Sequence, residues 1–179
     1  MPSAIGHAAP ALALIPLFHR RDTPRRLWVL GVLCAMAPDL DVLAFRFGIP
    51  YEHVLGHRGF WHSIPFAAGF AAAVCLAAFP RPRPGFSRAR AWGYLFLATV
   101  SHGMLDAFTN GGLGVALFSP FDDHRYFFPY RPIEVSPLGV GAFLSERGVA
   151  VLVSELVWVW VPCALLAASC LAWACRRRS

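Results

Sequence analysis

Lysine is absent from this sequence of 179 residues, and charged side chains of all kinds make up only 15% of it. Soluble domains carry roughly 25% charged residues, whereas this chain is 57% apolar. Much of the apolar excess lies in runs that approach the roughly 20 residues needed to cross a bilayer. The composition therefore argues against an ordinary soluble domain and indicates an integral membrane protein.

Two further absences argue against a zinc–thiolate site and against a cleaved signal peptide. The five cysteines lack the short paired spacing of a zinc–thiolate site, and we interpret them as small hydrophobic residues. The N-terminal apolar stretch lacks the basic segment of a signal peptide and contains His7 and Pro10. We therefore expect this stretch to be retained as part of the folded protein.

The apolar runs predict an all-α, polytopic membrane helical bundle with about five transmembrane segments, formed by a single domain over residues 1–179. The segments are expected at about 3–18, 27–47, 61–79, 91–108 and 149–174. Two prolines are expected to break the first segment, and a Pro-Asp-Leu-Asp stretch from Pro38 interrupts the second. The connection 110–148 is rich in glycine, proline and aromatic residues, and we expect it to form an ordered outer loop.

The arginines predict the orientation of the bundle. Eleven of the sixteen fall in 19–26, 80–90 and 176–178, which share one side if five segments alternate. Because cytoplasmic loops are enriched in basic residues, the C-terminus is expected in the cytoplasm and the N-terminus outside. The net charge of +6 is explained by this topology signal, so no nucleic-acid partner is expected.

Histidines and aspartates from four different segments gather at the outer ends of the predicted helices. A charged group at membrane depth costs roughly 2.5–3.5 kcal/mol on insertion scales, so such groups normally pair or bind a ligand. Imidazole and carboxylate are common ligands of zinc and related ions. The sequence therefore predicts a divalent metal site, with zinc as the expected metal and two or three ions, facing outside. The predicted ligands are His7, Asp39, Asp41, His57, His62, His102 and Asp106.

Each motif also has a simpler explanation. His102 and Asp106 are four residues apart and share a helix face, where they could form a buried hydrogen-bonded pair. Asp39 and Asp41 could end one helix and cap the next. Two other classes of protein stay open: a transporter or ion pathway that uses the intramembrane histidines and aspartates, and a non-catalytic protein with a structural metal site. The convergence of all the motifs on one membrane face favours a catalytic metal site.

Four further residues are candidates for catalysis or substrate binding. Arg58, Arg125 and Arg131 lie on the outer side and could bind a phosphate through bidentate hydrogen bonds. The alternative, that they are ordinary interfacial arginines, is equally open. Glu155 lies inside the fifth segment and is a candidate general base or a residue that orients a ligand. The predicted catalytic residues are therefore Glu155, Arg58 and Arg131.

Four motifs together resemble the YdjM-type family of bacterial inner-membrane, metal-dependent hydrolases. They are Gly6-His7, Pro38-Asp39-Leu40-Asp41, His57-Arg58-Gly59-Phe60-Trp61-His62-Ser63 and Ser101-His102-Gly103-Met104-Leu105-Asp106. The resemblance extends from the N-terminus to about Phe121, and Trp61 departs from the threonine that the family usually has there. The family is distantly similar to zinc-dependent phospholipases C, which implies phosphoester hydrolysis with His102 and Asp106 as the matching ligand pair.

The resemblance implies a membrane-bound hydrolase of the bacterial inner membrane. Its expected reaction is cleavage of a phosphoester in a lipid or lipid-linked substrate by a metal-activated water at the outer membrane face. The expected partners are membrane lipid and this substrate, and the sequence leaves the oligomeric state open.

Overall fold

The computed structural model describes residues 1–81, 84–137 and 140–176. Within these ranges the protein is helical, and the pairing between extended segments is limited to isolated bridges. This confirms the all-α class. Three of the arginines used to predict the orientation, Arg83, Arg177 and Arg178, lie outside the described residues.

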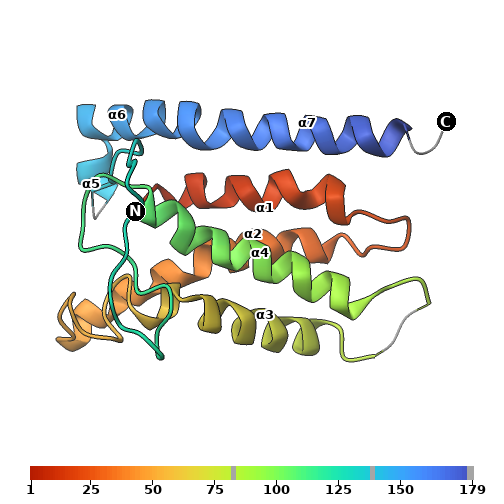
Figure 1. Ribbon diagram of the computed structural model, residues 1–179, viewed down its shortest axis with the longest axis horizontal. Helices are drawn as coiled ribbons and strands as arrows, with labels where there is room; N and C mark the ends of the chain where they lie inside the picture. Colours follow the sequence, from red (N-terminus) through yellow and green to blue (C-terminus); the bar gives the residue numbers. More distant parts are fainter. Residues whose placement is uncertain (82–83, 138–139, 177–179) are drawn as a thin grey trace.

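The helices run back and forth along one axis, as Figure 1 shows. In chain order they are α1 (Ala4–Phe18), α2 (Arg26–Met36), the 3₁₀ stretch η1 (Ala37–Phe47), the 3₁₀ turn η2 (Phe60–His62), α3 (Ile64–Ala78), α4 (Arg88–Ala107), α5 (Val140–Phe143), α6 (Glu146–Glu155), the π-helical stretch η3 (Leu156–Trp160) and α7 (Val161–Arg176).

Serine residues start three of the helices. The hydroxyl oxygens of Ser3, Ser63 and Ser87 each accept a hydrogen bond from the backbone N–H three residues later. These side chains satisfy backbone donors that the first helical turn leaves unpaired. Gly48 ends η1 with a φ of 73°, a left-handed conformation that glycine adopts without steric cost.

The prolines have different effects in the first two segments. α1 continues through Pro10 and Pro16, so the expectation that they break the first segment is wrong. Its contacts with α2, α4 and α7 hold it together, because packing outweighs the loss of a backbone hydrogen bond. The interruption predicted from Pro38 takes the form of a change from α-helix to the 3₁₀ stretch η1, which begins at Ala37 and continues to Phe47.

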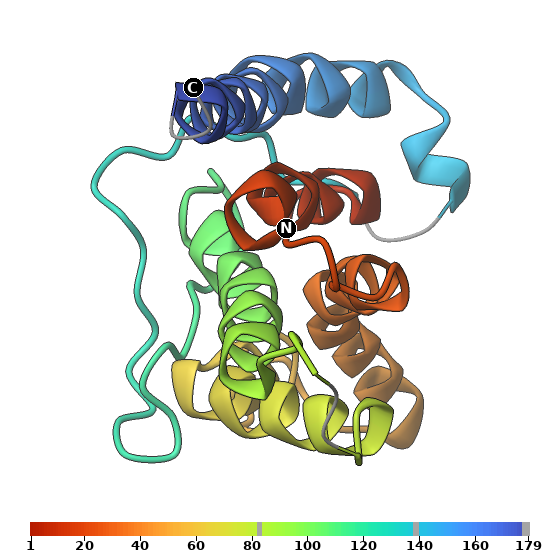
Figure 2. The same cartoon turned by 90° about the vertical axis from the view of Figure 1, so that its right-hand side faces the viewer.

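α4 is the central helix and contacts α1, α2 and α3, whereas α7 packs against α1 at the side of the bundle (Figure 2). Tyr94 of α4 is fully buried, and its hydroxyl donates to the Ala11 carbonyl at 3.1 Å. A Cβ atom at Gly31 would lie 2.3 Å from that hydroxyl. Glycine is therefore required where α2 crosses α4.

Among the described residues, two helical stretches are long and apolar enough to cross a membrane: Arg26–Phe47, which comprises α2 and η1, and Glu146–Trp173 in the C-terminal helix. α1 and α3 are apolar but shorter. The α1–α2 connection, the α3–α4 connection and the end of α7 lie at one end of the bundle, and the end of α4, η1 and α5 lie at the other (Figure 1). The predicted ligands are all at this second end.

Candidate metal centre

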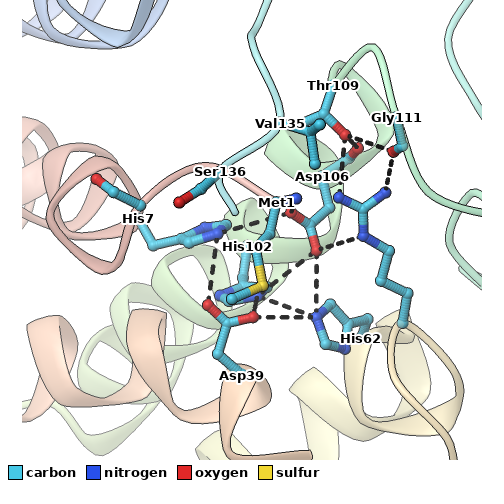
Figure 3. Close-up of polar contacts among 12 residues, drawn as sticks. Met1, His7, Asp39, His62, His102, Asp106, Thr109, Gly111, Val135 and Ser136 are labelled. Carbon is cyan, nitrogen blue, oxygen red and sulfur yellow. Dashed lines mark hydrogen bonds and ion pairs between the residues drawn. The ribbon is translucent and has the colours of Figure 1, made fainter. Parts of the chain in front are cut away.

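The structure brings all seven predicted metal ligands to one end of the bundle, where Figure 3 shows five of them in contact. They come from α1, η1, the following loop, η2 and α4. The side chain of Asp39 is 15% exposed, and the other six side chains are buried. Seven polar side chains gathered inside an apolar bundle require hydrogen-bond partners within the protein or a bound ion.

Four of these side chains form the first ligand group. One nitrogen or oxygen atom from each of His7, Asp39, His102 and Asp106 can be chosen so that all four lie within 4.8 Å of one another. His7 Nε2 is 3.8 Å from Asp39 Oδ2 and 3.7 Å from Asp106 Oδ1. The rings of His7 and His102 stack with centroids 3.6 Å apart. Three separate helical elements thus point nitrogen and oxygen atoms at a common position.

Several of these atoms are buried without a hydrogen-bond partner. Both ring nitrogens of His7 and both carboxylate oxygens of Asp106 are in this condition. Leaving a buried polar atom unsatisfied costs about 1–3 kcal/mol, and more for a charged group. A divalent cation would give His7 Nε2 and the Asp106 carboxylate a common partner, and nitrogen and carboxylate oxygen are suitable ligands for zinc. The donor set therefore fits a metal ion.

A second ligand group consists of Asp39, His57 and His62. Asp39 is common to both groups, and His62 of the second group also contacts members of the first. The Nε2 atom of His62 is 3.0 Å from His102 Nε2 and 3.2 Å from Asp106 Oδ2. Two adjoining groups that share a carboxylate are suited to holding more than one ion.

A hydrogen bond to the backbone of α2 determines which ring nitrogen of His102 can bind a metal ion. Its Nδ1 atom is 2.7 Å from the carbonyl oxygen of Ala35. Because a carbonyl can only accept, Nδ1 carries the proton and donates it in this bond. The neutral ring then presents the Nε2 lone pair to the cluster, as metal-binding histidines commonly do.

Asp41 lies behind two of the histidines. Its Oδ1 atom is 2.7 Å from His57 Nδ1, and its Oδ2 atom is 3.1 Å from His62 Nδ1 and accepts the Arg58 backbone N–H. Asp41 belongs to neither ligand group. The contacts suit a residue that orients imidazole rings. Its predicted role as a direct ligand stays a prediction.

Arg58 is buried against Asp106. Its guanidinium donates to the Gly111 carbonyl at 2.8 Å and to Thr109 Oγ1 at 3.0 Å, and its Nε atom is 3.4 Å from Asp106 Oδ2. Its backbone has a φ of 61°, which is uncommon for a residue other than glycine. This conformation points the N–H towards Asp41 and the side chain towards Asp106, so both carboxylates depend on it.

The other two arginines have different surroundings. Arg125 donates to the carbonyl oxygens of His57 and Tyr51 at 3.0 and 2.9 Å. Burial lowers the pKa of Arg125, although nearby Tyr51 and acidic groups oppose this change. Arg131 is exposed and lies over the ring of Phe127. Arg125 therefore supports the loop that carries His57, and the phosphate-binding role of each arginine stays a prediction.

Glu155 is the last residue of α6, and its side chain contacts the start of α1. It is fully buried and accepts hydrogen bonds from the Ser3 backbone N–H and from the Ser3 hydroxyl, the latter at 2.7 Å. His7 follows on the next turn of the same helix. A carboxylate is favourable at a helix N-terminus, so Glu155 joins α6 to the helix that carries His7.

Several residues at the site have no signal in the sequence. The Ala35 and Gly111 carbonyls act through the backbone, which any residue supplies. Gly103 is required because a Cβ atom there would lie 2.4 Å from the His62 carbonyl oxygen. Thr109, which follows Asp106 by three residues, could have been noticed as a polar residue next to a predicted ligand.

The fold and the site define a helical membrane protein with a buried histidine–aspartate cluster that could bind metal. Residues 1–178 match the YdjM inner membrane protein family, and the chain belongs to that family. It is 39% identical to the inner membrane protein YbcI of Escherichia coli (strain K12) over 166 residues, which cover 93% of this chain and 95% of that protein. The inner-membrane location and the family are thereby confirmed.

No solved structure matches the chain. The similarity to zinc-dependent phospholipases C therefore stays a prediction.

Proposed function

We propose that this protein is a metal-dependent hydrolase of the bacterial inner membrane that cleaves a phosphoester of a lipid or lipid-linked substrate. The observation that carries the proposal is the set of buried ligand atoms on His7 and Asp106 that lack a hydrogen-bond partner, next to Asp39 and His102. A proton pathway would also use buried histidines and aspartates. Its groups would form a chain through the bundle, whereas these residues form a compact cluster at one end.

The protein's own residues define what such a site would do. The Ala35 carbonyl presents Nε2 of His102 to the cluster, Asp41 orients His57 and His62, and the buried guanidinium of Arg58 holds Asp106. A divalent ion bound here would lower the pKa of a coordinated water towards about 7 and polarise a phosphoryl oxygen. Asp39 is the most exposed member of the cluster and is therefore the ligand most accessible to water.

Substrate contacts and general base catalysis belong to the same proposal. Both terminal nitrogens of Arg58 already donate to protein oxygens, so we assign Arg58 a positioning role and leave phosphate binding to the metal ions with Arg131. The Glu155 carboxylate already accepts a hydrogen bond from Ser3 at the start of α1. We therefore propose that Glu155 positions His7, which lies on the same helix. Zinc is the expected metal, because imidazole and carboxylate are the ligands.

We further propose a five-pass topology with the cluster at the outer membrane face. The helices alternate in direction, and the arginine-rich connections lie at the end opposite to the cluster (Figure 1). The positive-inside rule places that end in the cytoplasm. The N-terminus and the metal site are then outside, and α7 ends in the cytoplasm.

Elemental analysis of the purified, detergent-solubilised protein tests the metal site. We expect about two or three zinc ions per chain in the wild type, the number that clusters of this kind use in hydrolysis. Asp106→Asn should lose most of the metal, because the substitution removes charge from a buried ligand. The matched control is Asp22→Asn, an exposed position in the α1–α2 connection at the other end of the bundle.

Hydrolysis is then measured with the metal-loaded wild type, on a soluble phosphodiester and on phospholipid vesicles. Activity that disappears with chelator and returns with zinc would support the proposal. If both variants and the wild type contain no metal after reconstitution with zinc, the proposal is wrong and a proton or ion pathway becomes the better explanation. Metal without hydrolysis would instead favour a structural site.

A further inference from the structure

A cavity of about 460 Å³ adjoins the metal centre between η1 and the start of α3. Its volume lies within the range of about 300–1,000 Å³ that is usual for sites that bind small molecules. The walls are formed by apolar side chains, among them Leu40, Ala44, Phe47, Leu55, Phe66 and Phe70. Trp61 also lines the cavity, and its indole N–H donates to the Leu55 carbonyl.

One acidic residue lines the cavity, and its carboxylate is buried against the metal centre. Asp41 lines the cavity and contacts His57 and His62 with its two carboxylate oxygens. His57 and His62 are members of the second ligand group. A molecule that fills this cavity is therefore surrounded by hydrocarbon along its length, and the end of it near Asp41 lies next to the cluster. That description fits an amphiphile.

The rim of the cavity lies on a segment that is apolar enough to cross the membrane. Leu40 and Phe47 are 66% and 81% exposed, and both belong to the last part of the candidate span Arg26–Phe47. In a bilayer, exposed apolar side chains at this position contact lipid. A hydrocarbon chain can thus pass between bilayer and cavity without crossing water.

We propose that this cavity binds one acyl chain of a membrane glycerophospholipid and thereby places the phosphate of that lipid at the metal centre. The inference rests on the proposed function, and it specifies the substrate class as a phospholipid. A phosphoester that carries such a chain makes contacts with the apolar cavity wall that a soluble phosphoester cannot make. The cavity therefore selects long-chain lipids over soluble phosphoesters, because binding energy far from the reacting bond is used to position it.

Photo-crosslinking tests this assignment with the full chain, loaded with zinc, in phospholipid nanodiscs. The probe is a phosphatidic acid that carries a diazirine at the end of one acyl chain. We expect adducts on Phe66 and Phe70, which line the cavity. Adducts on Leu76, which is 60% exposed on α3 and does not line the cavity, report labelling by bulk lipid. The ratio of Phe70 to Leu76 adducts is the measurement.

A variant that fills the cavity should lower this ratio. Ala44→Trp is expected to abolish the excess of Phe70 over Leu76 adducts, because the indole occupies the space of the acyl chain. Ala73→Trp is the matched control, since Ala73 is exposed on α3 outside the cavity. If Ala44→Trp fails to fold, competition in the wild type replaces it. Excess unlabelled long-chain phosphatidic acid should remove the Phe70 adducts, and a short-chain analogue should not.

Two results would overturn the assignment. One is an unchanged Phe70 to Leu76 ratio in folded Ala44→Trp or under long-chain competition. The other is labelling of Ile5 and Phe143, which line a separate cavity of about 370 Å³ next to Asp39, in place of Phe70. Hydrolysis of a soluble phosphodiester by the wild type is measured in parallel. Hydrolysis without cavity adducts contradicts only this inference, and cavity adducts without any hydrolysis contradict only the proposed function.

Discussion

At the scale of single residues, the site depends on side chains that do not themselves reach the cluster centre. Arg58 is the clearest case, since its side chain is 1% exposed and its nitrogens contact Asp106, Thr109 and Gly111. A buried carboxylate needs a nearby positive charge to stay ionised. Arg58 supplies that charge to Asp106 together with the N-terminal ammonium of Met1, which is 3.8 Å from Asp106 Oδ1; neither Asp106 oxygen has a hydrogen-bond partner.

Replacement of Arg58 by methionine separates a positioning role from a phosphate-binding role. We expect Arg58→Met to lose metal and to destabilise the protein by about 3–5 kcal/mol, as is usual when one partner of a buried ion pair is removed. Zinc content and thermal unfolding in detergent measure both effects. Arg131→Met is the control, because Arg131 is exposed. Wild-type zinc content in Arg58→Met, together with a raised KM for phosphodiester, would instead show that Arg58 binds substrate.

The sequence predicts which residue types form the cluster, but it does not predict which of them belong to a ligand group and which orient the ligands. Histidine and aspartate inside apolar segments are expensive, so their presence at His102 and Asp106 is informative. The sequence does not distinguish Asp39 from Asp41, although one joins both ligand groups and the other lies behind two histidines. That difference depends on the 3₁₀ geometry of η1, in which successive side chains point in different directions.

At the scale of helices, the C-terminal helix has a specific connection to the site. Glu155 ends α6 just before the π-helical stretch η3, and it accepts hydrogen bonds from Ser3 at the start of α1. A π-helical insertion changes the angular position of the residues around it and is frequent at functional sites. The sequence identified Glu155 as unusually deep. Its partner could not be predicted, because the contact spans 152 positions of the chain.

Substitution of Glu155 by glutamine tests whether it positions α1 or acts as a general base. Glutamine keeps an oxygen that can accept from the Ser3 hydroxyl, so we expect Glu155→Gln to keep its zinc and most of its hydrolytic activity. Glu155→Ala should lower the thermal stability and the zinc content, since His7 follows Ser3 on α1. Glu146→Gln, at the exposed start of α6, is the control. A general base would show a different pattern, a loss of about 10²–10⁴-fold in rate for Glu155→Gln at full zinc content.

At the scale of the whole molecule, the arginine-rich connections and the metal centre are at opposite ends of the bundle. The connections with most of the described arginines lie at one end, and the metal centre and the loop after α4 lie at the other (Figure 1). That loop is held to α4 by hydrogen bonds from Phe128 N–H to the Ala107 carbonyl and from Ile133 N–H to the Phe108 carbonyl. The sequence predicts an ordered outer loop over 110–148; the structure pairs the part before Pro137 with α4, residues 138–139 lie outside the described residues, and α5 and the start of α6 occupy the last part.

The sidedness of the bundle can be measured with a membrane-impermeant maleimide in cells whose outer membrane has been made permeable. In a variant with the five native cysteines replaced by alanine, we expect Asp122→Cys, in the exposed loop after α4, to be labelled in intact cells. Asp22→Cys, in the arginine-rich α1–α2 connection, should be labelled only after lysis, because basic loops stay in the cytoplasm. The cysteine-free parent must retain wild-type zinc content. The opposite labelling pattern would place the metal centre on the cytoplasmic face, where it would act on lipids of the inner leaflet.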